Sequence, residues 1–205
     1  MTTKKIMRLK PQQALSVLLV EDVIDKYSEL KMAILKLNHH ISDTLNCGEK
    51  LAKKCAQIMP KILIIHTNSV DSYLLKELAK IDQLSPLPVI IFATQETPSL
   101  IQSAVKVGVS TYIINGFETQ RLASVITVAQ ERFKDRQLLR NELQQTKIQL
   151  ANRKIVERAK GFVMQQKNIS EQEAFNMLRK IAMNNGHSLA TVAKNVIEVS
   201  ELLHE

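Results

Sequence analysis

The amino-acid sequence predicts a doubly wound α/β domain with five parallel strands, then a long coiled-coil helix, then a small module of three helices. Three observations predict this order. Short apolar runs alternate with helix-length amphipathic stretches between residues 16 and 114. No glycine or proline occurs between Gly116 and Gly161, and a capping-box pattern at Ser170 marks the start of a further helix.

The five strands are predicted from the apolar runs. Four runs are almost wholly apolar, as expected of parallel strands covered on both faces, whereas 41–46 alternates like a strand near a sheet edge. The four almost wholly apolar runs are residues 16–20, 62–66, 88–93 and 111–114. Helices are expected between them, one over 26–37 and one that begins at Thr97-Pro98, a capping residue followed by proline at the first helical position.

Residues 117–160 are predicted to form one helix that is too long for a small domain to cover. Its apolar residues follow four-three-four spacing in two sets, with a phase slip near Arg136. This heptad pattern predicts a homodimer through a coiled coil; the alternative is a helix that packs back on its own domain. The predicted dimerisation residues are Leu122, Ile126, Ala129, Phe133, Leu139, Leu143 and Leu150, with Thr146 on the same line.

The last fifty residues are expected to fold as three amphipathic helices around one small core. The first carries Ile155, Ala159 and Phe162, the second starts at Ser170 and ends at Gly186, and Ser188 caps the third. The predicted organisation is therefore a basic tail over 1–13, an α/β domain over 14–116, a dimerisation helix over 117–152 and a helical domain over 153–205.

Composition restricts the functional classes. The chain has 205 residues, a formal charge of +8 and two cysteines, too few for a disulfide framework or a zinc knuckle. No apolar run is long enough to cross a membrane and no secretory signal is apparent, so we expect a cytoplasmic protein without a membrane partner. No phosphate-binding glycine loop, nucleophile motif or metal-ligand spacing occurs; the sequence therefore supports no enzyme, catalytic residue, metal or cofactor.

The excess positive charge lies in the N-terminal tail and after residue 130, around a neutral centre. Such asymmetry indicates an acidic partner for the C-terminal part, nucleic acid being the commonest, although a solvated helix surface would show the same charge. Gly161, in the middle of a helix, suggests close approach of a neighbouring helix or a ligand backbone. The residues predicted to contact nucleic acid are Arg153, Lys154, Arg158, Lys160, Gln165, Arg179 and Lys180.

The α/β region, about residues 14–130, resembles response-regulator receiver domains, which have a flavodoxin-like sheet. Glu21 and Asp22 follow the first strand, where receivers carry a Mg²⁺-binding acidic pair. The other receiver positions depart from the pattern: His66 replaces the phosphoacceptor aspartate, Ala93 the hydroxyl residue, and Asn115 the lysine. Because an imidazole cannot act as the attacking carboxylate or as an oxygen ligand, we expect a degenerate pseudo-receiver that is not phosphorylated by acetyl phosphate.

The segment 157–197 (ERAKGFVMQQKNISEQEAFNMLRKIAMNNGHSLATVAKNVI) resembles the ANTAR domain, an RNA-binding output module of transcription antiterminators. The match rests on Ala159-Lys160-Gly161, Met164, Ala174, Leu178-Arg179, Ala182-Met183 and Val192-Ala193. The whole order of domains resembles the AmiR/NasT family, and GVSTYIINGF, Arg132-Phe133 and the closing VSELL are most similar to its NasT-like, nitrate- and nitrite-responsive branch.

This resemblance implies a dimeric response regulator that binds paired stem-loops in a nascent leader mRNA and so prevents a terminator from forming. It also implies control by a regulatory sensor protein and target genes for nitrate and nitrite assimilation. Two alternatives remain open on the sequence. One is a DNA-binding response regulator with a helical output domain; the other is a protein-interaction scaffold whose basic face has no ligand.

Overall fold

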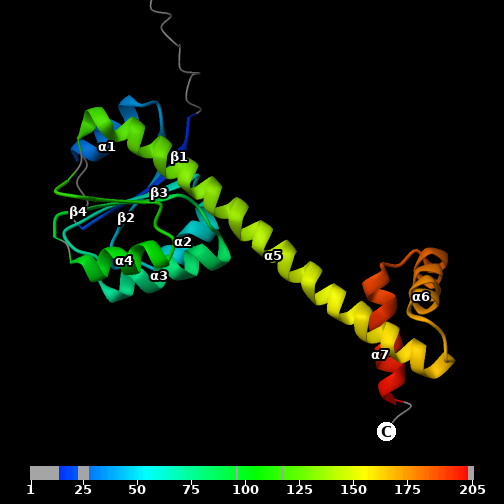
Figure 1. Ribbon diagram of the computed structural model, residues 1–205. Helices are drawn as coiled ribbons and strands as arrows, with labels where there is room; N and C mark the ends of the chain where they lie inside the picture. The colour runs from blue at the N-terminus through cyan, green and yellow to red at the C-terminus, as the bar shows by residue number, and fades with distance from the viewer. Residues whose placement is uncertain (1–13, 23–27, 96, 117, 203–205) are drawn as a thin grey trace, which may run out of the picture. The chain divides into compact units, whose positions relative to one another are not determined.

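The computed structural model describes residues 14–22, 28–95, 97–116 and 118–202, and divides the chain into two compact units, residues 1–136 and 137–205. The predicted basic tail over 1–13 lies outside the described residues. The first unit contains a five-stranded parallel sheet in the order β2-β1-β3-β4-β5, the order of the flavodoxin-like doubly wound fold (Figure 1). The strands are β1 (Ser16–Glu21), β2 (His40–Asn46), β3 (Ile62–Thr67), β4 (Val89–Ala93) and β5 (Thr111–Ile114).

The helices of this unit begin and end where local chemistry allows it. Ser28 and Asp71 accept hydrogen bonds from first-turn N–H groups of their helices, whereas Thr97 makes no such bond and Pro98 occupies the first turn. Gly108, just after the fourth helix, has φ +106°, a conformation that favours glycine. The helices are α1 (Glu29–Lys36), α2 (Leu51–Ile58), α3 (Ser72–Leu84) and α4 (Pro98–Lys106), and a short 3₁₀ turn, η1, covers Thr119–Arg121.

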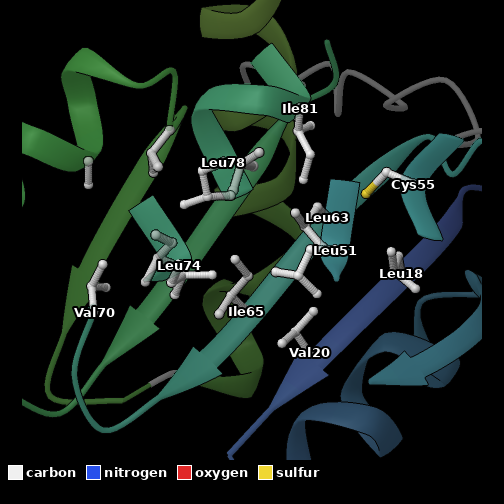
Figure 2. Packing of buried hydrophobic residues seen from close by; sticks show 14 of the residues in the cluster. Leu18, Val20, Leu51, Cys55, Leu63, Ile65, Val70, Leu74, Leu78 and Ile81 are labelled. Atoms are coloured by element: carbon white, nitrogen blue, oxygen red, sulfur yellow. The ribbon is translucent and has the colours of Figure 1, made fainter. Parts of the chain in front are cut away.

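Each face of the sheet is covered by its own hydrophobic cluster. On one face Leu18, Val20 and Ile65 of the strands pack with Leu51 of α2 and Leu74 of α3 (Figure 2). On the other, alternate strand residues pack against α1 and the beginning of α5 (Leu122–Lys167). Because successive residues of a strand point to opposite faces, an apolar run with both sides covered places all its side chains in a core.

The first four residues of the predicted dimerisation seam are not available to a second chain. Leu122, Ile126 and Ala129 are at most 1% exposed and belong to the cluster that covers the sheet of their own domain. Phe133 is half-buried and lines a hollow of the same unit with Leu15 and Pro88. The prediction of a coiled coil is therefore wrong for this part of the helix, and the predicted domain boundary at residue 116 moves to the end of this packed segment, near Arg136.

The second unit contains the last part of α5, α6 (Glu171–Asn185) and α7 (Leu189–Leu202), as three helices around one core. The predicted capping box is present: the Ser170 hydroxyl accepts from the Glu173 N–H at 3.3 Å, and Glu173 Oε2 accepts from the Ser170 N–H at 2.9 Å. Gly186 ends α6 with φ 64°. Ala159, Leu178 and Ala193 are fully buried, so each helix contributes to the core through a narrow face.

Candidate functional site

The carboxyl ends of the strands bring the five predicted receiver positions to one edge of the sheet. β1 ends at Glu21, β4 ends at Ala93, and Asn115 follows β5 with φ 63°. His66 pairs in register with Glu21, and its Nδ1 lies 3.8 Å from Glu21 Oε1. The predicted constellation is therefore assembled in space, with an imidazole where a carboxylate would be needed.

Asp22 is committed to hydrogen bonds within the chain. Its Oδ1 accepts from the Thr67 hydroxyl at 2.9 Å, and its Oδ2 accepts from the Asn68 N–H at 2.5 Å. Burial raises the pKa of the Asp22 carboxyl, but these donors, the Cys47 thiol and nearby His66 outweigh burial and hold its pKa below the ordinary value. Within the described ranges no group of three or more His, Cys, Asp or Glu side chains is placed to hold a metal ion.

Four of the basic residues predicted to contact nucleic acid are exposed and uncommitted. Arg153 and Lys154 lie on α5 and Arg179 and Lys180 on α6, and no carboxylate of a described residue pairs with any of them. Gln165, also on α5, is exposed as well. An exposed cation without a partner retains its charge for an external anion.

The other two basic residues have carboxylate partners inside the module. Arg158 Nη2 lies 2.6 Å from Glu201 Oε1, and its guanidinium lies 5.6 Å from the centre of the Phe162 ring. Lys160 was predicted to contact nucleic acid, but the residue is only 8% exposed. Its Nζ lies 2.8 Å from Glu157 Oε2 and 2.7 Å from Glu171 Oε1.

The remaining predicted dimerisation residues lie on an unpartnered face of α5. Leu139, Leu143 and Leu150 are 66%, 55% and 55% exposed. They fall between the two cores, where every residue from 138 to 154 is exposed. Three large aliphatic side chains on one face of a solvated helix expose apolar area that a second helix could bury.

Sequence reasoning missed a hollow of about 310 Å³ in the helical module, lined by residues from α5, α6 and α7. Gln166 of α5, Asn185 of α6 and Asn195 of α7 contribute amide side chains to its lining. The signal was present in part, because Gln166 is four residues after Phe162 and so falls on the apolar face of the helix. The sequence could not predict which amide side chains of α6 and α7 lie near Gln166, because that depends on how the three helices pack.

No helix in the described part of the chain is long and apolar enough to cross a membrane.

Each comparison with known proteins matches a part of the chain. The ANTAR domain model matches residues 144–197, a segment that includes the second half of α5, all of α6 and the first part of α7. The transcriptional regulatory protein PdtaR of Mycobacterium tuberculosis, from strains CDC 1551 and H37Rv, is 28% identical over 111 residues. This stretch covers 54% of the chain and 54% of PdtaR, so the chain spans about half the length of these curated relatives.

The first unit is similar in fold to the signal receiver domain of a modulated diguanylate cyclase from Desulfovibrio desulfuricans G20. The TM-score is 0.51 with 19% identity, over 59% of this chain and 97% of that chain. At this identity the likeness shows the receiver-like fold alone. The predicted fold class, a five-stranded parallel sheet followed by a long helix and further helices, is confirmed.

Proposed function

We propose that this protein is an RNA-binding transcription antiterminator, in which a degenerate receiver domain is joined to an ANTAR output module. The observation that carries the proposal is the match of the ANTAR model to residues 144–197. In this segment Arg153, Lys154, Arg179 and Lys180 are exposed and have no carboxylate partner among the residues that the structure describes. Lysine and arginine side chains bind phosphates and hold a folded RNA in register, while bases in its loops remain available for recognition.

The proposed action requires two modules. Two chains pair along the exposed face of α5 that carries Leu139, Leu143 and Leu150, and the dimer then presents two modules to a pair of stem-loops in a leader mRNA. Binding the paired stem-loops prevents the overlapping terminator from forming, so the polymerase continues. The regulator changes no covalent bond in the RNA, and it acts where transcription takes place, in the cytoplasm.

The target genes and the control of the protein form the finer part of the proposal. The resemblance of GVSTYIINGF and VSELL to the NasT-like branch supports genes of nitrate and nitrite assimilation and a sensor protein that sequesters the regulator. His66 at the phosphoacceptor position supports control by such a partner in place of phosphorylation.

The decisive experiment is competition binding with the full chain. A labelled leader RNA with two tandem hairpins is titrated with the protein at several salt concentrations, and unlabelled competitors are then added. We expect tandem hairpins to compete far better than scrambled RNA of the same length or than duplex DNA. Because phosphate contacts release counterions, the affinity should fall steeply with salt.

Two results would contradict the proposal. Equal competition by scrambled RNA would show that the protein does not recognise the tandem hairpins. Preferential competition by the DNA duplex would support the DNA-binding alternative. A variant with Lys180 and Arg179 both changed to alanine tests the assigned face, because loss of two phosphate contacts should weaken binding and lower the salt slope by about 2.

A further inference from the structure

We propose that a hollow at the amino ends of the central strands is a docking site for an acidic peptide segment of a partner protein. We call it the amino-end hollow; it measures about 460 Å³, and its lining includes Leu15, Lys61, Pro88, Gln130, Phe133 and Lys134. The inference goes beyond the proposed function, because this hollow lies in the receiver unit, whereas the residues proposed to contact RNA lie in the ANTAR module.

Three adjacent strands form one side of the amino-end hollow. Leu15 comes directly before β1, Lys61 directly before β3 and Pro88 directly before β4, and these three strands are neighbours in the sheet. The Lys61 N–H donates to the Ser16 carbonyl at 2.8 Å, and the Leu63 N–H donates to the Pro88 carbonyl at 2.9 Å. The carboxyl ends of the same strands carry the degenerate receiver positions, so the hollow lies at the opposite edge of the sheet, on a backbone that the sheet holds in place.

The lining offers an apolar place for one inserted side chain. Leu15 and Pro88 are buried, and Phe133 on α5 is half-buried. The volume lies within the range of roughly 300–1,000 Å³ that is typical of binding pockets. An aliphatic or aromatic side chain placed there would be removed from water, and anchors of this kind supply much of the affinity of protein interfaces.

The charges around this apolar lining are positive. Among the described residues, no aspartate or glutamate lines the amino-end hollow, and no carboxylate pairs with the exposed Lys61. Lys134 Nζ lies 2.6 Å from Glu131 Oε1, but both side chains are at least 60% exposed. Exposed ion pairs contribute little to stability, so a carboxylate of a partner can take the place of Glu131.

The N-terminal sequence adds positive charge near the same place. Ala14, which also lines the hollow, follows a tail whose first ten residues contain four lysine or arginine residues and no acidic residue. Ten residues of extended chain span at most about 36 Å, so these charges stay within reach of a partner bound at the hollow. The proposed RNA binding leaves the tail without a role, and an acidic partner accounts for the charge of the tail and of the hollow together.

An acidic peptide fits this combination better than RNA does. A nucleic-acid base carries hydrogen-bonding groups around its edge, and most of them would be left unpaired against Leu15, Pro88 and Phe133. An aliphatic or aromatic side chain leaves no such group unpaired there. Carboxylates on either side of it in the peptide can pair with Lys61 and Lys134.

The test uses the full chain and a short synthetic peptide with one tryptophan flanked by glutamates. The chain itself contains no tryptophan, so the fluorescence of the peptide reports its own environment. We expect the tryptophan emission to shift to shorter wavelength as protein is added, and the affinity to fall with salt. A peptide with glutamine in place of every glutamate, and one with alanine in place of tryptophan, should compete about tenfold less well or worse.

Two substitutions separate the charge from the apolar contact. Lys61→Glu reverses an exposed charge and should weaken peptide binding about fivefold or more at low salt. Lys53→Glu is the matched control, because Lys53 is an exposed lysine of α2 that does not line the hollow, and it should bind the peptide nearly as the wild type does. Phe133→Ala removes the aromatic wall and should weaken binding about tenfold at every salt concentration. Melting temperatures are recorded for every variant; should Phe133→Ala not fold, Lys61→Glu alone decides.

The docking site would be overturned by an unshifted tryptophan emission, by equal competition from the glutamine peptide, or by equal loss of affinity in Lys53→Glu and Lys61→Glu. Displacement of the peptide by an unstructured RNA would assign the hollow to nucleic acid instead. Changing Lys4, Lys5, Arg8 and Lys10 to glutamine should weaken peptide binding, whereas tighter binding would show that the tail itself occupies the hollow. None of these results bears on the RNA-binding function, which the tandem hairpins test separately.

Discussion

The ammonium group of Lys160 on α5 lies 2.7 Å from Glu171 Oε1, at the first residue of α6. Oε2 of Glu157, one turn earlier on α5, lies 2.8 Å from the same ammonium group. The lysine, itself nearly buried, thus connects two helices of the module through carboxylates that remain exposed, and we interpret it as a residue that positions α6. Glu171 also lies in the first turn of α6, where a negative charge favours the helix.

Acid should weaken this connection. The hydrogen bond from Lys160 lowers the pKa of Glu171 from its ordinary value of 4.5, whereas Glu157 first, and then Glu171, raises the pKa of Lys160. A carboxyl group whose pKa is lowered by folding contributes stability above its ordinary pKa and loses that contribution as the pH falls through the folded value. We therefore expect melting temperature to fall below about pH 4.5, and less steeply in Glu171→Gln than in the wild type.

Thermal melts of both proteins between pH 3 and 8, followed by circular dichroism, measure the difference. Lys160→Met serves as the matched variant, since it keeps the aliphatic stem and removes the charge, and it should lower the melting temperature at neutral pH. Identical acid dependence in wild type and Glu171→Gln would show that the ion pair does not stabilise the folded module.

The side chains at the carboxyl ends of the strands, where His66 lies, should not accept a phosphoryl group. His66 occupies the position from which a carboxylate would attack, and both oxygens of Asp22 accept hydrogen bonds from Thr67 and Asn68. Without a third oxygen ligand Mg²⁺ has little to bind, and the charge of the transferring group is left uncompensated. Incubation with acetyl phosphate and Mg²⁺, followed by intact-mass measurement, should show no added phosphoryl group. A Mg²⁺-dependent adduct on His66 would contradict this.

Both cysteines should be unreactive in the folded protein. Burial raises the pKa of the Cys47 thiol to about 12, with a further contribution from Asp22, and burial raises the pKa of Cys55 to about 11. At pH 8 only about one Cys47 thiol in 10⁴ is then ionised, so alkylation by iodoacetamide should be very slow until the protein is unfolded. Peptide mass spectrometry after timed labelling measures each site separately.

Asp22→Asn supplies a control within the same molecule. The substitution removes a negative charge and an acceptor beside Cys47, so labelling of Cys47 should become faster. Cys55 owes its raised pKa to burial and to Glu77, and its rate should stay the same. Equal acceleration at both cysteines would indicate general loosening of the domain.

Much of the fold could be predicted because the local signals agree with the tertiary structure. The apolar runs place all five strands within about one residue of their observed ends, and the capping box at Ser170 and Glu173 begins α6 as expected. These features depend on residues close in sequence or on a sheet covered on both faces. Neither requires knowledge of which distant segments meet.

The errors have a common physical origin. The spacing of Leu122, Ile126 and Ala129 is the same whether a helix packs against its own sheet or against a second helix, so sequence periodicity alone could not separate the two. Likewise, the helical angle of Lys160 gives the face on which it lies, but the carboxylate of Glu171 comes from another helix. The hollow between α5, α6 and α7 needs three helices at once, which no local pattern encodes.

The two parts of α5 should respond differently to substitution. Leu143→Lys places a charge in the exposed apolar face, so a dimer held there should dissociate to monomers with little loss of domain stability. Ile126→Ala removes buried side-chain volume from the receiver core and should lower its free energy of unfolding by about 2–5 kcal/mol. Analytical ultracentrifugation should show the Ile126→Ala protein with the mass of the wild type. If the wild type sediments as a monomer, the proposed dimer interface along this face of α5 is wrong.

Gly161 should be replaceable without loss of stability but with loss of RNA binding. The sequence suggested that a neighbouring helix or a ligand backbone approaches this glycine. Apart from its chain neighbours and the adjacent backbone of its own helix, however, no described atom lies within 4 Å of where a Cβ would be. A neighbouring helix of the described chain therefore does not explain it. On the helix, Gly161 lies close to Arg158 and Gln165, three residues before and four residues after it, and Lys154 is two turns earlier on the same side.

Gly161→Ala should therefore stabilise the module by about 1 kcal/mol, because alanine is the better helix former and meets no obstacle. If an RNA backbone approaches this side of α5, the added methyl group should weaken hairpin binding, and Gly161→Leu should weaken it more. Asn141→Ala is the matched control, since it raises helix propensity at an exposed position of α5 outside the ANTAR match. A more stable Gly161→Leu protein that binds tandem hairpins as tightly as the wild type would show that the RNA does not come close to this side.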